Sequence, residues 1–232
     1  MADAQEKTAN ELDEIRLAAD ASTPIDASTP IDSATPIDPA TRAENAANLQ
    51  KMAVIYGVAA VASLALFGAG HTWAATSGWL LAMGTGVAAA IVAGMVLSSI
   101  THEWGHYSGA ALSKSALKIT AEPVNYFFFL NFDANNNSTR QALWMSWGGL
   151  AGSWLLVLAI ALLVPLDSWV SAALLATVLG RAVNASVFEV PIALRTRRSR
   201  NFKQELADQL ESPGIVKVPG LVVGLAFLAL AT

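Results

Sequence analysis

The chain of 232 residues contains no cysteine, and only 14% of its residues are charged. Without cysteine it forms neither a disulfide nor a thiolate metal site, so any metal ion must be held by histidine, carboxylate, amide or water. The scarcity of charge, together with 54% hydrophobic residues, excludes an ordinary soluble domain and predicts an integral membrane protein. We therefore expect the surroundings of the chain to be a lipid bilayer, with no nucleic-acid partner.

The first 50 residues also lack the early apolar stretch of a cleavable signal peptide, so the first apolar run is expected to direct membrane insertion. Residues 21–38 of this segment contain three six-residue repeats, each with the sequence Thr-Pro-Ile-Asp. Regularly spaced proline stops a helix, and one isoleucine per repeat buries too little surface to repay ordering. The sequence therefore predicts a disordered tail over residues 1–50. The repeats serve as a linker, or they dock on a partner protein or accept phosphate.

Apolar runs long enough to cross a bilayer follow the tail. Four are predicted to span the membrane: Met52–Gly70, Gly78–Ile100, Ala142–Val164 and Trp169–Leu194. A weaker fifth run, Ile215–Ala231, contains Lys217 and Pro219 and is a candidate for a crossing, an interfacial helix or a re-entrant segment. The prediction is an all-α polytopic membrane protein with a transmembrane core over 51–194, a basic segment over 195–214 and a candidate membrane helix over 215–232.

The segment between the second and third runs has a different amino-acid composition. Aromatic and β-branched residues gather in 117–120 and 124–130, and they are followed by the asparagine-rich segment 131–137. This composition predicts short strands or a membrane-associated hairpin. Such a hairpin either accepts an extended peptide by strand addition or only seals the fold as an interfacial loop.

Of the segments that flank the first four apolar runs, only alternate ones contain lysine or arginine. The connections 71–77 and 165–168 contain none, whereas basic residues precede the first run, follow the second and fourth, and precede the third. Because basic flanks tend to stay on the cytoplasmic side, the amino terminus is predicted to be cytoplasmic. The second run then ends near the cytoplasmic face.

The most informative motif, His102-Glu103-Trp104-Gly105-His106, lies where the second run ends. On a helix the two histidines of an H-E-x-x-H motif project from one face and can bind the same ion. Glu103 would then be the general base that takes a proton from the attacking water. Alternatively, His102 and His106 are buried groups hydrogen-bonded across helices, or ligands of a site without hydrolytic activity.

Three features resemble the site-2 protease family of intramembrane zinc metalloproteases. Ser98–Ala111 is similar to the family's H-E-x-G-H-x-x-x-A segment, an aromatic strand-like stretch follows, and Ser146–Trp154 is similar to the small-residue A-G-P-x-x-N entry to the next helix. The resemblance implies a Zn²⁺ cofactor and cleavage of a membrane protein or peptide within or near the bilayer. It also favours a bacterial inner membrane as the location.

The family usually takes its third metal ligand from an Asp-Gly on a later span, and this chain has no such pair. Glu189 is the only carboxylate of the corresponding span and is the candidate third ligand, while Asn184 resembles a family asparagine that stabilises the oxyanion or orients substrate. On a straight helix these two residues lie about 140° apart, so both face one ion only if Pro191 distorts the helix. Glu189 could instead pair with Arg181 or snorkel to the surface.

Two other classes of function remain open. The chain could be a non-catalytic, protease-like subunit of a larger membrane complex, with Gly148 and Gly152 packing against a partner helix or within the chain. It could also be a haem or electron-transfer protein, although His71 lies at the opposite membrane surface from His102 and His106. Loss of cleavage without Glu103 would exclude the first class, and zinc without haem absorbance would exclude the second.

Overall fold

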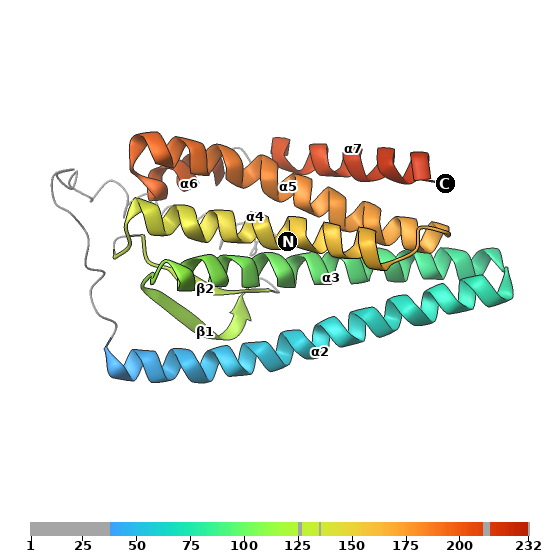
Figure 1. Cartoon of the computed structure of the whole chain (residues 1–232), viewed down its shortest axis with the longest axis horizontal. Helices are drawn as coiled ribbons and strands as arrows, with labels where there is room; N and C mark the ends of the chain where they lie inside the picture. The colour runs from blue at the N-terminus through green and yellow to red at the C-terminus, as the bar shows by residue number, and fades with distance from the viewer. Residues whose placement is uncertain (1–37, 125–126, 135, 211–213, 232) are drawn as a thin grey trace, which may run out of the picture.

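A computed structural model describes residues 38–124, 127–134, 136–210 and 214–231. The predicted repeat-bearing tail lies outside the described residues, apart from Asp38. In chain order the elements are α2 (Pro39–Ser77), α3 (Leu80–Leu112), β1 (Leu117–Val124), β2 (Phe128–Phe132), α4 (Thr139–Leu163), α5 (Trp169–Ser199), α6 (Phe202–Leu210) and α7 (Gly214–Ala231). The described chain is therefore helical apart from one hairpin and its connections (Figure 1).

Four helices, α2 to α5, are long and apolar enough to cross a membrane. They match the four predicted runs, except that α3 begins two residues after the start of the second run and α4 ends one residue before the end of the third. The predicted polytopic all-α class is confirmed. The fifth run forms α7, whose apolar part is Val218–Ala231. At 1.5 Å per residue this part spans about 21 Å, less than the hydrocarbon thickness of about 30 Å.

Helix α2 begins earlier than the apolar pattern indicates. Its first turn is capped by Asp38, whose carboxylate accepts hydrogen bonds from the backbone N–H and the hydroxyl of Thr41, and Pro39 follows the cap. These bonds hold the pKa of Asp38 below its ordinary value. Residues 39–50, predicted to belong to the tail, are therefore helical, because capping and proline at the first helical position favour a helix that hydrophobicity does not reveal.

The helices α3, α4 and α5 pack against one another, while α2 lies along α3 and α7 lies along α5 (Figure 1). Glycines allow α3 and α4 to approach closely. A Cβ on Gly148 would meet the carbonyl oxygen of Gly105 and the backbone of Gly109, and one on Gly152 would meet the carbonyl oxygen of Thr101. The Gly148 and Gly152 pair therefore serves packing within the chain, which was one of its two interpretations.

The predicted hairpin is present as two antiparallel strands. Leu117 pairs with Phe132 and Ile119 with Leu130, and the register shifts between Ile119 and Val124. Side chains of α2 occupy the outer edge of β1: Asn45 accepts from the Ile119 N–H at 2.9 Å and donates to the Leu117 carbonyl at 2.7 Å, and Asn48 donates to the Ile119 carbonyl at 2.9 Å. In this conformation α2 thus fills the β1 edge that an added strand would need.

The alternating directions of α2 to α5 bring the predicted basic flanks to one end of the bundle. This end holds the beginnings of α2 and α4, the ends of α3 and α5, and the hairpin (Figure 1). Basic residues in this part of the chain are Arg42, Lys51, Lys114, Lys118, Arg140, Arg195, Arg197, Arg198, Arg200 and Lys203. The opposite end holds the α2–α3 and α4–α5 turns, so the charge asymmetry read along the sequence is also an asymmetry in space.

Candidate metal centre

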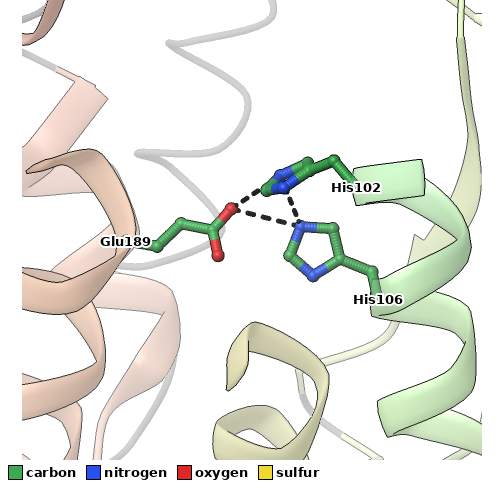
Figure 2. A group of neighbouring side chains, drawn as sticks. All are labelled: His102, His106 and Glu189. Atoms are coloured by element: carbon green, nitrogen blue, oxygen red, sulfur yellow. Dashed lines mark hydrogen bonds and ion pairs between the residues drawn. The ribbon is translucent and has the colours of Figure 1, made fainter. Parts of the chain in front are cut away.

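Three side chains from two helices converge inside the bundle near its basic end. His102 and His106 come from α3, and Glu189 comes from α5 (Figure 2). Glu189 Oε1 lies 2.8 Å from His102 Nε2 and 3.2 Å from His106 Nε2, and the two Nε2 atoms are 3.0 Å apart. The predicted ligand set, including the carboxylate 83 residues away from the nearer histidine, is therefore brought together as a group that could hold a metal ion.

Helix α4 determines which nitrogen each histidine presents to the centre. His106 Nδ1 lies 2.9 Å from the Met145 carbonyl oxygen, and His102 Nδ1 lies 3.1 Å from the Gly149 carbonyl oxygen and 2.9 Å from Ser153 Oγ. Since a carbonyl only accepts, we assign the hydrogen of each neutral ring to Nδ1. Each Nε2 then carries a lone pair directed at Glu189, as a metal ligand requires.

The electrostatics of this group favour a cation at its centre. Two nitrogen lone pairs and one carboxylate oxygen face one another within 3.2 Å. Glu189 Oε2 is buried and has no hydrogen-bond partner among the described residues. Unpaired acceptors in such a position repel one another and have lost their hydration, so a metal ion or a proton must compensate them.

The donor set and spacing fit zinc. Zinc binds histidine nitrogen at about 2.0–2.1 Å and carboxylate oxygen at about 2.0–2.2 Å, which places tetrahedral ligand atoms about 3.3 Å apart. The observed separations of 2.8 to 3.2 Å reach that value with movements of a few tenths of an ångström. The group supplies three protein ligands, one fewer than a closed tetrahedral zinc site has.

Gly149 makes room for the site. A Cβ at this position would collide with the His106 imidazole, whose Nδ1 and Nε2 atoms would lie 2.6 Å away. The absence of a side chain thus lets α4 approach closely enough for its carbonyl oxygens to accept from both histidines. Sequence reasoning identified Ser146–Trp154 as a small-residue helix entry but missed the direct roles of Gly149, Ser153 and the Met145 carbonyl.

The position of Glu189 answers the geometric question raised by the sequence. Glu189 faces the histidines, whereas the Asn184 side chain turns toward α7, where its Oδ1 accepts from the Gly220 N–H at 2.9 Å. Pro191 lies inside α5 without bringing the two side chains together. Glu189 is not paired with Arg181, whose guanidinium instead reaches Ser99. A role of Asn184 at the oxyanion stays a prediction.

Glu103 lies on α3 between the two histidines, but its carboxylate is bound by the hairpin. Its Oε1 accepts from the backbone N–H groups of Phe129 at 3.1 Å and Leu130 at 3.2 Å, and the residue is buried. This carboxylate fixes β2 to α3 beside an aromatic cluster that includes Tyr56 and Phe129. A catalytic role of Glu103 stays a prediction. The contact shows that the residue also holds the hairpin.

Comparisons with protein-family models, with curated proteins and with solved structures give no significant match for this chain. The functional argument therefore rests on the site itself.

Proposed function

We propose that this chain is an intramembrane zinc metalloprotease that resembles the site-2 proteases and cleaves a peptide bond within or next to the bilayer. The observation that carries the proposal is the convergence of His102, His106 and Glu189 on one point between two membrane-spanning helices. An ionisable cluster at membrane depth is costly and marks a functional site. The H-E-x-x-H motif adds a carboxylate that a purely structural metal site does not need.

In this proposal each residue has a defined task. His102, His106 and Glu189 hold the ion, and the α4 carbonyls keep both imidazoles in the tautomer that binds metal. A zinc ion held by these residues would supply Lewis acidity that activates water for attack. Glu103 takes the proton of the attacking water and delivers it to the leaving amine. The histidine side chains are 20% and 15% exposed, so part of each ring is open to the surroundings of the bundle.

The contact between Glu103 and β2 distinguishes the two oxygens of the carboxylate. Oε1 accepts from the backbone N–H groups of Phe129 and Leu130. Since Oε1 is occupied by the hairpin, Oε2 is the oxygen left to accept the proton in this proposal.

The location follows from the same interpretation. The described helices place the protein in a membrane, and the basic end of the bundle holds the metal group. We propose that this end faces the cytoplasm and that the membrane is a bacterial inner membrane. The substrate is then a membrane protein or peptide whose scissile bond reaches the cytoplasmic half of the bilayer.

A second candidate is a non-catalytic, metal-binding subunit of a membrane complex. The observation in its favour is the same bond between Glu103 and β2, which gives the glutamate a structural task independent of hydrolysis. Glu103→Gln separates the two candidates, since glutamine keeps an oxygen that accepts from Phe129 and Leu130 but no longer accepts the catalytic proton.

The first experiment measures the zinc content of the purified protein beside His106→Ala and Glu189→Ala. We expect about one zinc per chain, lost in both variants, because each supplies one of three ligands. His71→Ala is the matched control: this histidine lies near the opposite end of the bundle, 3.9 Å from Asp167, and should leave the zinc content unchanged. A wild-type protein without zinc would contradict the proposal.

The second experiment measures cleavage of a library of transmembrane peptides in proteoliposomes by mass spectrometry. We expect Glu103→Gln to abolish cleavage while zinc content and thermal stability stay at the wild-type values. Cleavage that is unchanged in Glu103→Gln would assign the residue to the hairpin alone and favour the non-catalytic subunit.

A further inference from the structure

Arg181 lies on α5 at a depth where the lipid chains of a bilayer offer its guanidinium neither a hydrogen-bond acceptor nor a counter-ion. Along the helix it is about 18 Å from Trp169, at the turn end, and about 21 Å from Arg195, at the basic end, with a rise of 1.5 Å per residue. The hydrocarbon layer is about 30 Å thick, so Arg181 is close to its middle. Its side chain is nevertheless exposed on the surface of the described bundle.

The guanidinium is poorly satisfied by the described chain. One of its nitrogens lies 3.5 Å from Ser99 Oγ on α3, a long hydrogen bond, although the group has five N–H donors. Arg181 is in none of the ion pairs found among the described residues. The carboxylate on the same helix, Glu189, contacts the two histidines instead. An exposed arginine at this depth is energetically costly unless something neutralises it.

Arg181 is also next to the metal centre. Ser99, its contact on α3, precedes His102 by three residues, so the two side chains lie about 60° apart on the helix and one turn along it. Met95, one turn further back on the same face, is 51% exposed. A single strip of α3 therefore leads from the exposed Met95, past the Arg181 guanidinium, to the two histidines.

We propose that Arg181 binds a carboxylate of the membrane segment that this site cleaves, an assignment that rests on the proposed protease function. The substrate class is then a transmembrane segment with an aspartate or glutamate near mid-membrane, about one helical turn from the bond presented to the metal centre. The pairing neutralises both charges at the depth where each is most costly. The planar guanidinium also accepts a carboxylate in a two-bonded, oriented geometry.

The probe for this proposal is a pair of Leu/Ala-rich transmembrane peptides that differ only in a central Glu or Gln. Their binding to the full chain is measured by energy transfer in phosphatidylcholine vesicles at pH 8, with Glu103→Gln as background so that no peptide is cut. We expect the Glu peptide to bind at least about tenfold more tightly than the Gln peptide. Moving the glutamate two helical turns toward either end should remove the preference.

Variants identify the residue responsible. Arg181→Gln should abolish the preference, and Arg181→Lys should keep part of it. Ser99→Ala, which leaves the guanidinium in place, and Arg197→Gln, at the exposed basic end of α5, should keep all of it. Zinc content at the wild-type value confirms that each variant is folded. Equal binding of the two peptides, or a preference that survives in Arg181→Gln, would overturn the proposal.

These measurements separate this assignment from the protease function. Peptide binding needs no hydrolysis, so zinc-dependent cleavage without a Glu preference would leave the protease standing and remove only the substrate class. A Glu preference in a protein that neither holds zinc nor cleaves would retain Arg181 as a binding residue and remove the protease, and with it the assignment of the bound segment as substrate.

Discussion

At the scale of single residues, the site depends on what α4 presents to α3. His102 and His106 are oriented by two backbone carbonyls and by Ser153. The Met145 carbonyl does not depend on the identity of its own side chain, whereas the Gly149 position must lack one. Ser153 also donates to the Gly149 carbonyl at 3.2 Å, so its hydroxyl oxygen remains an acceptor for His102 Nδ1. Such outer contacts commonly change metal affinity by about 10- to 100-fold when removed.

Gly149→Ala is the sharpest test at this scale. The added methyl group would collide with the His106 ring, so we expect lower zinc affinity and a loss of stability on the order of 1–3 kcal/mol from overpacking. Zinc competition titration and thermal unfolding measure the two effects. Gly68→Ala on α2, where an added Cβ meets nothing within 4 Å, is the control and should leave zinc affinity unchanged without lowering stability. Wild-type zinc affinity in Gly149→Ala would mean that α4 does not set the ring position.

The same residues show which parts of the candidate site can be predicted from the sequence. The histidines are predictable because a spacing of four residues is local, and Glu189 because its span contains no other carboxylate. The contact between Glu103 and β2, and those of Asn45 and Asn48 with β1, join segments that are distant in the sequence. No local pattern encodes such pairs, since polar side chains on a helix fit many partners.

At the scale of elements, the hairpin is held from both sides by helices. Asn45 and Asn48 of α2 bind the backbone of β1, and Glu103 of α3 binds the backbone of β2. A hairpin of two strands alone is marginally stable. These side-chain hydrogen bonds stabilise it by pairing backbone groups that a third strand would otherwise pair. The hairpin was predictable from its aromatic and β-branched composition, but the filling of its β1 edge was not.

Asn45→Ala should loosen β1. The variant removes the acceptor of the Ile119 N–H and the donor to the Leu117 carbonyl, at a cost of about 1 kcal/mol for each bond. Hydrogen–deuterium exchange of the segment 117–120 measures the effect, and we expect about tenfold faster exchange. Glu44→Ala, an exposed residue of the same turn, is the control. Unchanged exchange in Asn45→Ala would show that the β1–β2 ladder alone holds the strand.

At the scale of the whole molecule, the candidate metal centre lies between two helices, α3 and α5. Its ligands come from α3 and α5, and α4 holds the rings from the third side. Helix α7 packs on α5 through Gly220 and Gly224, next to the Gly180 and Ala176 backbone. Glycines therefore allow close helix contacts at the α5–α7 interface as well as between α3 and α4, while His102, His106 and Glu189 lie toward the basic end.

Zinc should stabilise this bundle by mass action. An ion that binds only the folded chain adds about 2.7 kcal/mol at a free concentration of 100 times its Kd. We expect the thermal unfolding midpoint in detergent to fall on chelation and to recover with zinc. His71→Ala should respond like the wild type, and His106→Ala should not respond. A midpoint that ignores both chelator and zinc in the wild type would speak against an ion bridging α3 and α5.

The use of α4 carbonyl oxygens to orient the histidines has a consequence for how this protein can diverge. Position 145 can exchange its methionine for another apolar residue of similar size without losing its acceptor, because the acceptor belongs to the backbone. Inserting one residue into α4 ahead of that position would instead rotate the carbonyls by about 100° and disconnect both rings. An exchange of the side chain at position 145 is thus tolerated far better than a change in the length of α4, and sequences that descend from this one should keep that length, and the glycines at 148, 149 and 152, longer than the methionine.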